Sequence, residues 1–201
     1  MARWEPGTPE RLQKAALELF AAQGFEQTTT LEIAQSVGVT ERTFFRHFSD
    51  KREVLFHGQQ SFEQAFVDGV EAAPPDAPAM DVVARSLRSA ASFFPEERRP
   101  YSRIRQSVID ANPALQEREL HKLSRLAVTV AAALRARGVD DLAATVAAQT
   151  GAALFGVAFS RWIKEDERRT LADIADDVLR ELTVLTRQAD PEAGARTHPR
   201  P

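Results

Sequence analysis

The residues best suited to chemistry lie within one short stretch, Thr28 to Lys51, with the sequence TTTLEIAQSVGVTERTFFRHFSDK. Its second half carries hydroxyl, guanidinium and imidazole groups that can hydrogen-bond to base edges or phosphates. These side chains belong to Thr40, Arg42, Thr43, Arg46 and His47. Phe44 and Phe48 stand four residues apart, which predicts that they share one side of a short helix. The pattern therefore predicts a helix with a polar outer face and an apolar inner face.

Two short helices joined by a tight turn are expected to position these groups. The first spans residues 31–37. Thr29 before it and Glu32 within its first turn have the spacing of a capping box. Gly38 supplies a residue that tolerates positive φ in the turn, and the second helix spans residues 41–48. This arrangement is a helix-turn-helix, whose second helix enters the major groove of DNA.

Charge supports this interpretation only weakly. The whole chain has 26 Lys and Arg against 29 Asp and Glu, a net charge of −3, so a DNA site must be a local patch. Residues 39–53 carry a net charge of only +1. The alternative is that these charges are the solvated face of a small helical bundle. Glu41 could repel phosphate or accept a hydrogen bond from a cytosine amino group.

From Arg11 to Phe56 the sequence resembles the tetracycline-repressor (TetR) family of bacterial regulators. The shared features are a Thr-rich entry to the first short helix, the pairs Ile-Ala, Gly-Val and His-Phe, and a Lys after the second helix. The DNA contacts that the resemblance implies are Thr29, Thr30, Thr40, Arg42, Thr43, Phe45, Arg46, His47 and Lys51. Arg42 is the candidate for a guanine contact. Thr30, His47 and Lys51 are the candidates for phosphate contacts.

The rest of the chain also predicts helices, about nine in all, and the fold class is all-α. Strict alternation of β-branched residues and Asn-Gly or Asp-Gly turns are both missing from the sequence. The other expected helices span residues 8–23, 51–73, 79–94, 97–111, 114–137, 141–165 and 170–188. We divide the chain into a three-helix DNA-binding domain with the helix-turn-helix, a helical domain for ligand binding and dimerisation, and a disordered tail. These span residues 1–56, 57–188 and 189–201.

Several classes of function are not expected from this sequence. It contains no cysteine, which excludes disulfides, thiolate metal sites and a cysteine nucleophile. Its four histidines lack metal-ligand spacing, and it has neither a Gly-rich phosphate loop nor a nucleophile elbow. We therefore expect no metal, no cofactor and no enzymatic role. Without an apolar run of about 18 residues or a secretory signal, we expect a cytoplasmic protein that does not contact membranes.

Small side chains are concentrated between Leu142 and Phe159, which predicts a helix that another helix can approach closely. The alternative is that this helix is buried inside one subunit. The TetR resemblance instead implies that the last two long helices pair with their copies across a two-fold axis. The interface residues that this implies are Ala144, Ala148, Gly151, Leu154, Ile174, Val178, Leu182 and Leu185.

Aromatic residues of the second domain suggest a pocket for an apolar or flat ligand. The candidate lining residues are Phe62, Phe66, Phe94, Tyr101, Arg105, Phe155, Phe159 and Trp162. The alternative is that these rings are ordinary core. The segment from Phe93 to Trp162 is also loosely similar to actinobacterial members grouped with the mycofactocin regulator, some of which respond to long-chain acyl-coenzyme A.

Together these patterns predict a homodimeric transcriptional regulator that binds a palindromic double-stranded DNA operator. It is expected to act as a repressor that a small apolar or amphipathic effector releases. Three alternatives stay open: a ligand-dependent activator, a helical protein-interaction module without DNA binding, and an enzyme with an unrecognised site.

Overall fold

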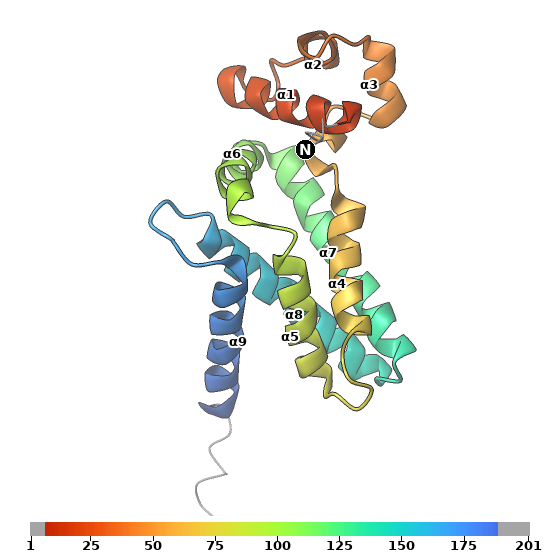
Figure 1. Ribbon diagram of the computed structural model, residues 1–201, viewed down its shortest axis with the longest axis vertical. Helices are drawn as coiled ribbons and strands as arrows, with labels where there is room; N and C mark the ends of the chain where they lie inside the picture. Colours follow the sequence, from red (N-terminus) through yellow and green to blue (C-terminus); the bar gives the residue numbers. More distant parts are fainter. Residues whose placement is uncertain (1–6, 189–201) are drawn as a thin grey trace, which may run out of the picture. The chain divides into compact units, whose positions relative to one another are not determined.

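The structure, a computed structural model, describes residues 7–188, and the predicted tail lies outside them (Figure 1). Within the described range the chain forms nine α-helices and two short 3-10 helices (η1 and η2), with no strand. The elements are α1 (Thr8–Gln23), α2 (Thr30–Ser36), α3 (Glu41–His47), η1 (Glu53–Phe56), α4 (Gln59–Glu71), α5 (Ala79–Ala91), η2 (Glu96–Arg98), α6 (Arg99–Asp110), α7 (Pro113–Ala136), α8 (Asp141–Trp162) and α9 (Leu171–Gln188). The all-α prediction is confirmed.

The helices fall into two compact units, and neither is a continuous piece of chain. The first comprises residues 7–64 and 96–126, and the second comprises residues 65–95 and 127–188. Helices α4 and α7 each contribute one part to each unit. The boundary that we drew between residues 56 and 57 follows chain order instead, and it stays a prediction about function.

In the first unit, α1, α2 and α3 share an apolar core with α6 and the start of α7. Leu12, Ile33 and Phe44, one from each of the first three helices, have no exposed surface. Ile109 of α6 and Leu115 of α7 belong to the same cluster of buried side chains. Burial of this kind is the main favourable term in folding, so α6 supports the helix-turn-helix from within the same core.

The helix that we predicted over residues 51–73 is interrupted, which corrects the sequence analysis. The 3-10 helix η1 ends at Phe56, and α4 begins only at Gln59. Between them His57 is extended and Gly58 has a φ of 85°. A residue with positive φ cannot continue a right-handed helix, so the chain bends here before α4 starts.

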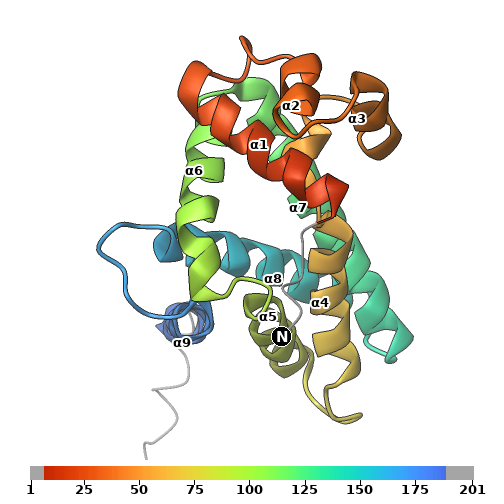
Figure 2. The same ribbon diagram turned by 45° about the horizontal axis from the view of Figure 1, so that its top comes forward.

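In the second unit, α8 packs against α5 and α9, and α5 packs against α9 (Figure 2). Helix α4 approaches α5 closely at Gly69, where a Cβ atom would lie 2.6 Å from the Cα of Ser86. The Ser86 hydroxyl donates to the carbonyl of Phe66 at 2.8 Å. Helix α8 approaches α5 in the same way, since a Cβ on Gly151 would lie 2.8 Å from a methyl of Val83. Small residues thus allow close helix packing within this unit.

By length and composition alone, α8 could cross a membrane, unlike any other helix of residues 7–188. Our run-length criterion overlooked it because Thr145, Gln149 and Thr150 interrupt its apolar residues. Its buried side chains extend from Ala144 to Trp162 and pack within the second unit. The core helix of a globular domain passes the same composition test, and packing against α5 and α9 buries part of the apolar surface of α8.

Candidate nucleic-acid interface

Helix α2 begins at the predicted capping box. The Thr29 hydroxyl accepts from the Glu32 N–H at 3.1 Å, and the Glu32 carboxylate accepts from the Thr29 N–H at 2.8 Å. The Thr29 N–H lowers the pKa of the Glu32 carboxyl below its ordinary value. After α2, Gly38 has a φ of 74°, in the left-handed region that favours glycine. Both local predictions are confirmed, and they fix where α3 can start.

Helix α3 has the predicted two faces. Phe44 has no exposed surface and Phe48 is 5% exposed, with 5.4 Å between their ring centroids. The exposed side chains of the helix are Arg42, Phe45, Arg46 and His47. Neither Arg42 nor Arg46 forms an ion pair with another residue in the range 7–188. The arrangement leaves two guanidinium groups on the outer face that can donate to bases or phosphates.

Side chains at the start of α3 are engaged within the protein. Thr40 caps the helix, and its hydroxyl accepts from the Thr43 N–H at 3.2 Å. The Thr30 hydroxyl donates to the Glu41 carboxylate at 2.5 Å, which connects the first residue of α2 to the first residue of α3. The sequence analysis missed this role of Glu41 because the two partners are 11 residues apart and lie on different helices.

Lys51 has partners other than the phosphate that we predicted. Its ammonium donates to the carbonyl oxygens of Phe25 at 2.6 Å and Thr28 at 2.9 Å. Backbone carbonyls have no signature in the sequence, so no pattern could have indicated these bonds. The predicted DNA contacts thus divide into exposed side chains on α3 and side chains such as those of Thr30 and Lys51, which already have partners.

The chain leaves α3 through a turn that Asp50 stabilises. Its carboxylate accepts from the backbone N–H groups of Arg52 at 2.8 Å and Glu53 at 3.1 Å. Burial acts to raise the pKa of the Asp50 carboxyl. The hydrogen bonds from Arg52 and Glu53 and the charge of Arg52 more than offset that effect and hold the pKa below its ordinary value. The carboxylate therefore stays ionised at neutral pH and keeps the turn closed.

Three of the predicted pocket residues, Phe62, Tyr101 and Arg105, belong to the first unit. Arg105 donates to the Leu55 carbonyl at 2.9 Å and forms a two-pronged ion pair with Glu119, at 2.8 and 3.2 Å. Tyr101 packs against the core of that unit, and burial raises the pKa of its hydroxyl to about 12. The guanidinium of Arg105, a candidate lining residue of the pocket, thus has an acidic partner within the protein.

The other five predicted pocket residues form a contiguous cluster of rings in the second unit. They are Phe66, Phe94, Phe155, Phe159 and Trp162. The centroid of Phe94 lies 5.2 Å from that of Phe159 and 5.9 Å from that of Trp162, which has no exposed surface. Such contacts are what ordinary core would show, and the pocket stays a prediction.

Five of the eight predicted interface residues are buried within the chain itself, which corrects that part of the prediction. They are Ala144, Ala148, Gly151, Leu154 and Ile174. These five residues offer little surface to a partner, because they pack inside the second unit. The remaining three, Val178, Leu182 and Leu185, are at least partly exposed.

The exposed apolar side chains of α8 lie on a different face, which the sequence analysis missed. Leu142 is 71% exposed, and Val146 and Val157 are each 57% exposed. Leu142 and Val146 are four residues apart, as are Ala153 and Val157, so each pair shares one side of the helix. That spacing is the signal that could have indicated this face.

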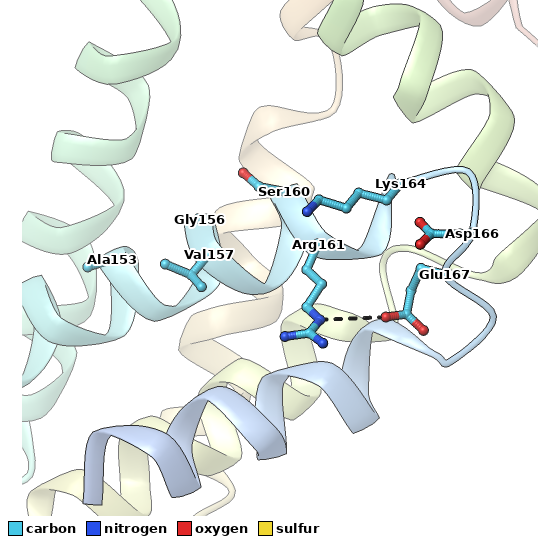
Figure 3. A pocket seen from close by; sticks show the side chains of 8 residues that line it. All are labelled: Ala153, Gly156, Val157, Ser160, Arg161, Lys164, Asp166 and Glu167. Atoms are coloured by element: carbon cyan, nitrogen blue, oxygen red, sulfur yellow. Dashed lines mark ion pairs between the residues drawn. The ribbon is translucent and has the colours of Figure 1, made fainter. Parts of the chain in front are cut away.

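An open groove of about 760 Å³ lies beside this face, where the end of α8 turns toward α9 (Figure 3). Its lining residues are Ala153, Gly156, Val157, Ser160, Arg161, Lys164, Asp166 and Glu167. The Arg161 guanidinium lies 3.7 Å from the Glu167 carboxylate, which also accepts from Arg169 at 2.7 Å. Hydrogen bonds from Arg169 hold the pKa of Glu167 well below its ordinary range. The groove is therefore lined by small residues such as Ala153 and Gly156 and by charged residues such as Arg161 and Glu167.

Two known protein families match this chain. Residues 12–57 match the bacterial regulatory proteins of the tetR family, and residues 77–185 match the MftR C-terminal domain. The two matches together cover the helix-turn-helix and most of the helices that follow it.

Curated relatives match over short stretches of this chain. The transcriptional regulator TcmR of Streptomyces glaucescens is 46% identical over 67 residues, which are 33% of this chain and 30% of TcmR. The mycofactocin biosynthesis transcriptional regulator MftR of Mycobacterium tuberculosis is 38% identical over 47 residues, which are 23% of this chain and 24% of MftR. The matches thus span less than a third of either relative.

Solved structures share the fold over most of the chain. FadR of Bacillus subtilis in complex with stearoyl-CoA has a TM-score of 0.59 and 18% identity, and the match covers 86% of this chain and 96% of FadR. Thermus thermophilus FadR in complex with lauroyl-CoA has a TM-score of 0.53 and 24% identity, covering 87% and 93%. At these identities the likeness concerns the fold.

Proposed function

Because the chain belongs to the TetR family of bacterial regulatory proteins and is a DNA-binding transcriptional regulator, we propose that it acts as a homodimeric repressor in the cytoplasm. A small ligand would release it from a near-palindromic operator, and it would have no enzymatic activity of its own. The observation that carries the proposal is the two-sided helix α3. Phe44 and Phe48 anchor it from inside, while Arg42 and Arg46 lie on its outer face.

The proposed contacts on DNA follow from this outer face. The Arg42 guanidinium would donate to O6 and N7 of a guanine, a pairing that discriminates by about 1–3 kcal/mol against a wrong base. The half-exposed ring of Phe45 would contact a thymine methyl. Arg46 and His47 would contact phosphates, which fix the position of the helix rather than the sequence.

Dimerisation through α8 and α9 would bring two copies of α3 to one duplex. The support is the pair of exposed apolar surfaces, Leu142, Val146 and Val157 on α8 and Leu185 on α9. The groove lined by Ala153 and other small residues would accept side chains of the second copy. A two-fold axis suits the function, because it places two recognition helices about 34 Å apart in successive major grooves.

The effector would be apolar or amphipathic and would bind in the second unit. The support is the cluster of rings around Phe94 and Phe155, together with the acyl-CoA ligands of the two FadR structures of similar fold. Ligand binding would shift the DNA-binding helices with a coupling free energy of about 1–3 kcal/mol.

Selection of bound duplexes from random-sequence DNA by the ligand-free full chain tests the DNA-binding part. We expect enrichment of a palindrome whose half-sites lie about one helical turn apart. Failure to enrich any sequence would overturn the proposal and favour an interaction module without DNA binding. A requirement for ligand during selection would favour an activator instead.

Titration with lauroyl-CoA and stearoyl-CoA tests the effector part. In a Trp4→Phe background, the fluorescence emission reports on Trp162, which lies in the ring cluster. We expect the emission to change as the selected duplex is released, with coenzyme A alone as the control for the acyl chain. Binding of either compound without release would contradict its role as effector.

A further inference from the structure

Lys51 places its ammonium among three backbone carbonyls of the loop between α1 and α2. The Nζ atom donates to Phe25 at 2.6 Å, to Thr28 at 2.9 Å and to Glu26 at 3.5 Å. It also lies 4.2 Å from the centroid of the Phe25 ring, within the range of a cation–π attraction. An ammonium has three N–H donors, and two of them make the short bonds to Phe25 and Thr28, while the Glu26 carbonyl lies at the outer limit for the third. In this arrangement the two short bonds and the Phe25 ring hold the Lys51 ammonium against the loop.

The loop that Lys51 holds determines where α2 begins. Thr28 is 1% exposed, and its hydroxyl donates to the Gly24 carbonyl at 2.8 Å and accepts from the Gln23 amide at 3.2 Å. The next residue, Thr29, is the N-cap of α2. A shift of this loop would therefore move the first turn of α2.

A second connection links the start of α2 to the recognition helix α3. The hydroxyl of Thr30, at the start of α2, donates to the carboxylate of Glu41, at the start of α3. Lys51 itself follows α3 along the chain. The position of α3 relative to α2 is thus fixed on both sides of α3, by the Glu41 bond where α3 starts and by the Lys51 bonds shortly after α3 ends.

From this geometry we propose that Lys51 is a positioning residue for DNA binding, not a phosphate contact. It holds the loop before α2, and through Thr30 and Glu41 it sets the orientation of α3 in the major groove. Moving its ammonium to a phosphate would take the donor away from the part-buried bonds to Phe25 and Thr28. The inference rests on the DNA-binding function and names a residue on which the alignment of α3 depends.

The salt dependence of DNA binding separates the two roles of Lys51. A side chain that neutralises a phosphate contributes about 0.9 to the slope of log K against log salt, and its loss weakens binding to all sequences alike. A side chain that only positions α3 contributes nothing to that slope, but its loss weakens base recognition. Loss of a phosphate contact should therefore lower the slope and leave the ratio of specific to non-specific affinity unchanged. Loss of a positioning residue should leave the slope unchanged and lower that ratio.

The experiment compares the full-length Lys51→Gln variant with wild-type protein on the selected duplex and on a scrambled duplex of the same length. We expect affinity for the selected duplex to fall about tenfold, as for the loss of charge-assisted hydrogen bonds, with little change on the scrambled duplex. The salt slope should stay at its wild-type value. Affinities are referred to the folded fraction from circular dichroism, so that a merely structural loss of folded protein leaves both readouts unchanged.

Two further variants complete the design. Arg46→Gln is the matched control for a lost cation on the same helix-turn-helix, and its slope should fall by about 0.9. Lys51→Arg keeps the charge but presents a planar fork instead of three divergent donors. We expect Lys51→Arg to lose specific affinity as Lys51→Gln does, whereas a phosphate contact predicts near wild-type binding.

A Lys51→Gln slope that falls as far as that of Arg46→Gln, or an unchanged ratio between the two duplexes, would overturn the proposal. Wild-type binding to the selected duplex would persist in that case, so the proposed function would stand. If the wild-type protein selects no duplex at all, the DNA-binding function itself fails.

Discussion

The helix-turn-helix and the α8 region both pack around buried apolar side chains, but they differ in the further interactions that hold their helices. Around α2 and α3, single hydrogen bonds fix the backbone, such as those of Lys51, Thr29 and Glu41. Around α8, stacked rings and close approaches at glycines such as Gly151 hold the helices. From this difference we expect that different substitutions will lower the stability of the protein and its affinity for DNA. Substitutions in the α8 core should first lower stability, and substitutions on the outer face of α3 should first lower affinity for DNA.

Trp162→Ala should have the largest effect on stability. Trp162 has no exposed surface, and its ring lies 5.8 Å from that of Phe159. Removing a buried aromatic ring leaves a cavity and should lower the free energy of unfolding by about 3–5 kcal/mol. Urea-induced unfolding at a fixed protein concentration measures it, with Trp162→Phe as the conservative control. A loss within about 1 kcal/mol would show that α8 is not the core of its unit.

Gly69→Ala tests whether close helix approach stabilises the second unit. The new Cβ would lie 2.6 Å from the Cα of Ser86, a backbone atom that cannot move alone, so we expect a loss of about 1–3 kcal/mol. In Gly151→Ala the new methyl would meet one side-chain atom of Val83, at 2.8 Å, and no backbone atom, so the loss should be smaller. Equal losses in the two melting curves would contradict this account of the packing.

Arg42→Ala tests the other half of the comparison. Arg42 is exposed, so the free energy of unfolding should stay within about 0.5 kcal/mol of wild type. Affinity for the selected operator should fall by about 1–3 kcal/mol, with relaxed preference at one base pair. Arg88→Ala, which removes an exposed cation from α5, is the matched control in gel-shift titrations. Unchanged operator affinity in Arg42→Ala would remove Arg42 from the interface.

Thr29→Ala should have the smallest effect, about 1 kcal/mol of stability from the lost helix cap. The pKa of Glu32 is lowered in the folded protein because its carboxylate accepts from the Thr29 N–H. Its contribution is therefore present above the ordinary carboxylate pKa and lost as the pH falls through the lowered value. Thermal melts of wild type and Glu32→Gln between neutral and acidic pH check this, and the two curves should converge in acid.

The sequence predicted the helix-turn-helix in detail because its signals are local. The capping box of Thr29 and Glu32, the positive φ of Gly38 and the shared side of Phe44 and Phe48 all depend on residues at most four positions apart. A short helix with two contrasting faces leaves little choice about which face is buried.

The same reasoning failed on α8 because that helix is apolar or small on most of its sides. Composition correctly indicated close helix approach, but it could not say to which neighbour. At Gly151 the neighbour is Val83 of the same chain, so the small residues that we assigned to an interface are buried within it. The bonds of Lys51 escaped prediction for another reason, since backbone carbonyls 23 to 26 residues away leave no trace in a sequence.

Protection of guanine N7 from methylation, on the selected duplex with ligand-free wild-type protein, tests the central claim most directly. N7 lies in the major groove, where α3 would place Arg42. The account predicts two clusters of protected guanines on one face of the duplex, about 10 base pairs apart, and loss of that protection in Arg42→Ala. Tight binding that leaves every guanine N7 reactive, or protects only one cluster, would contradict it.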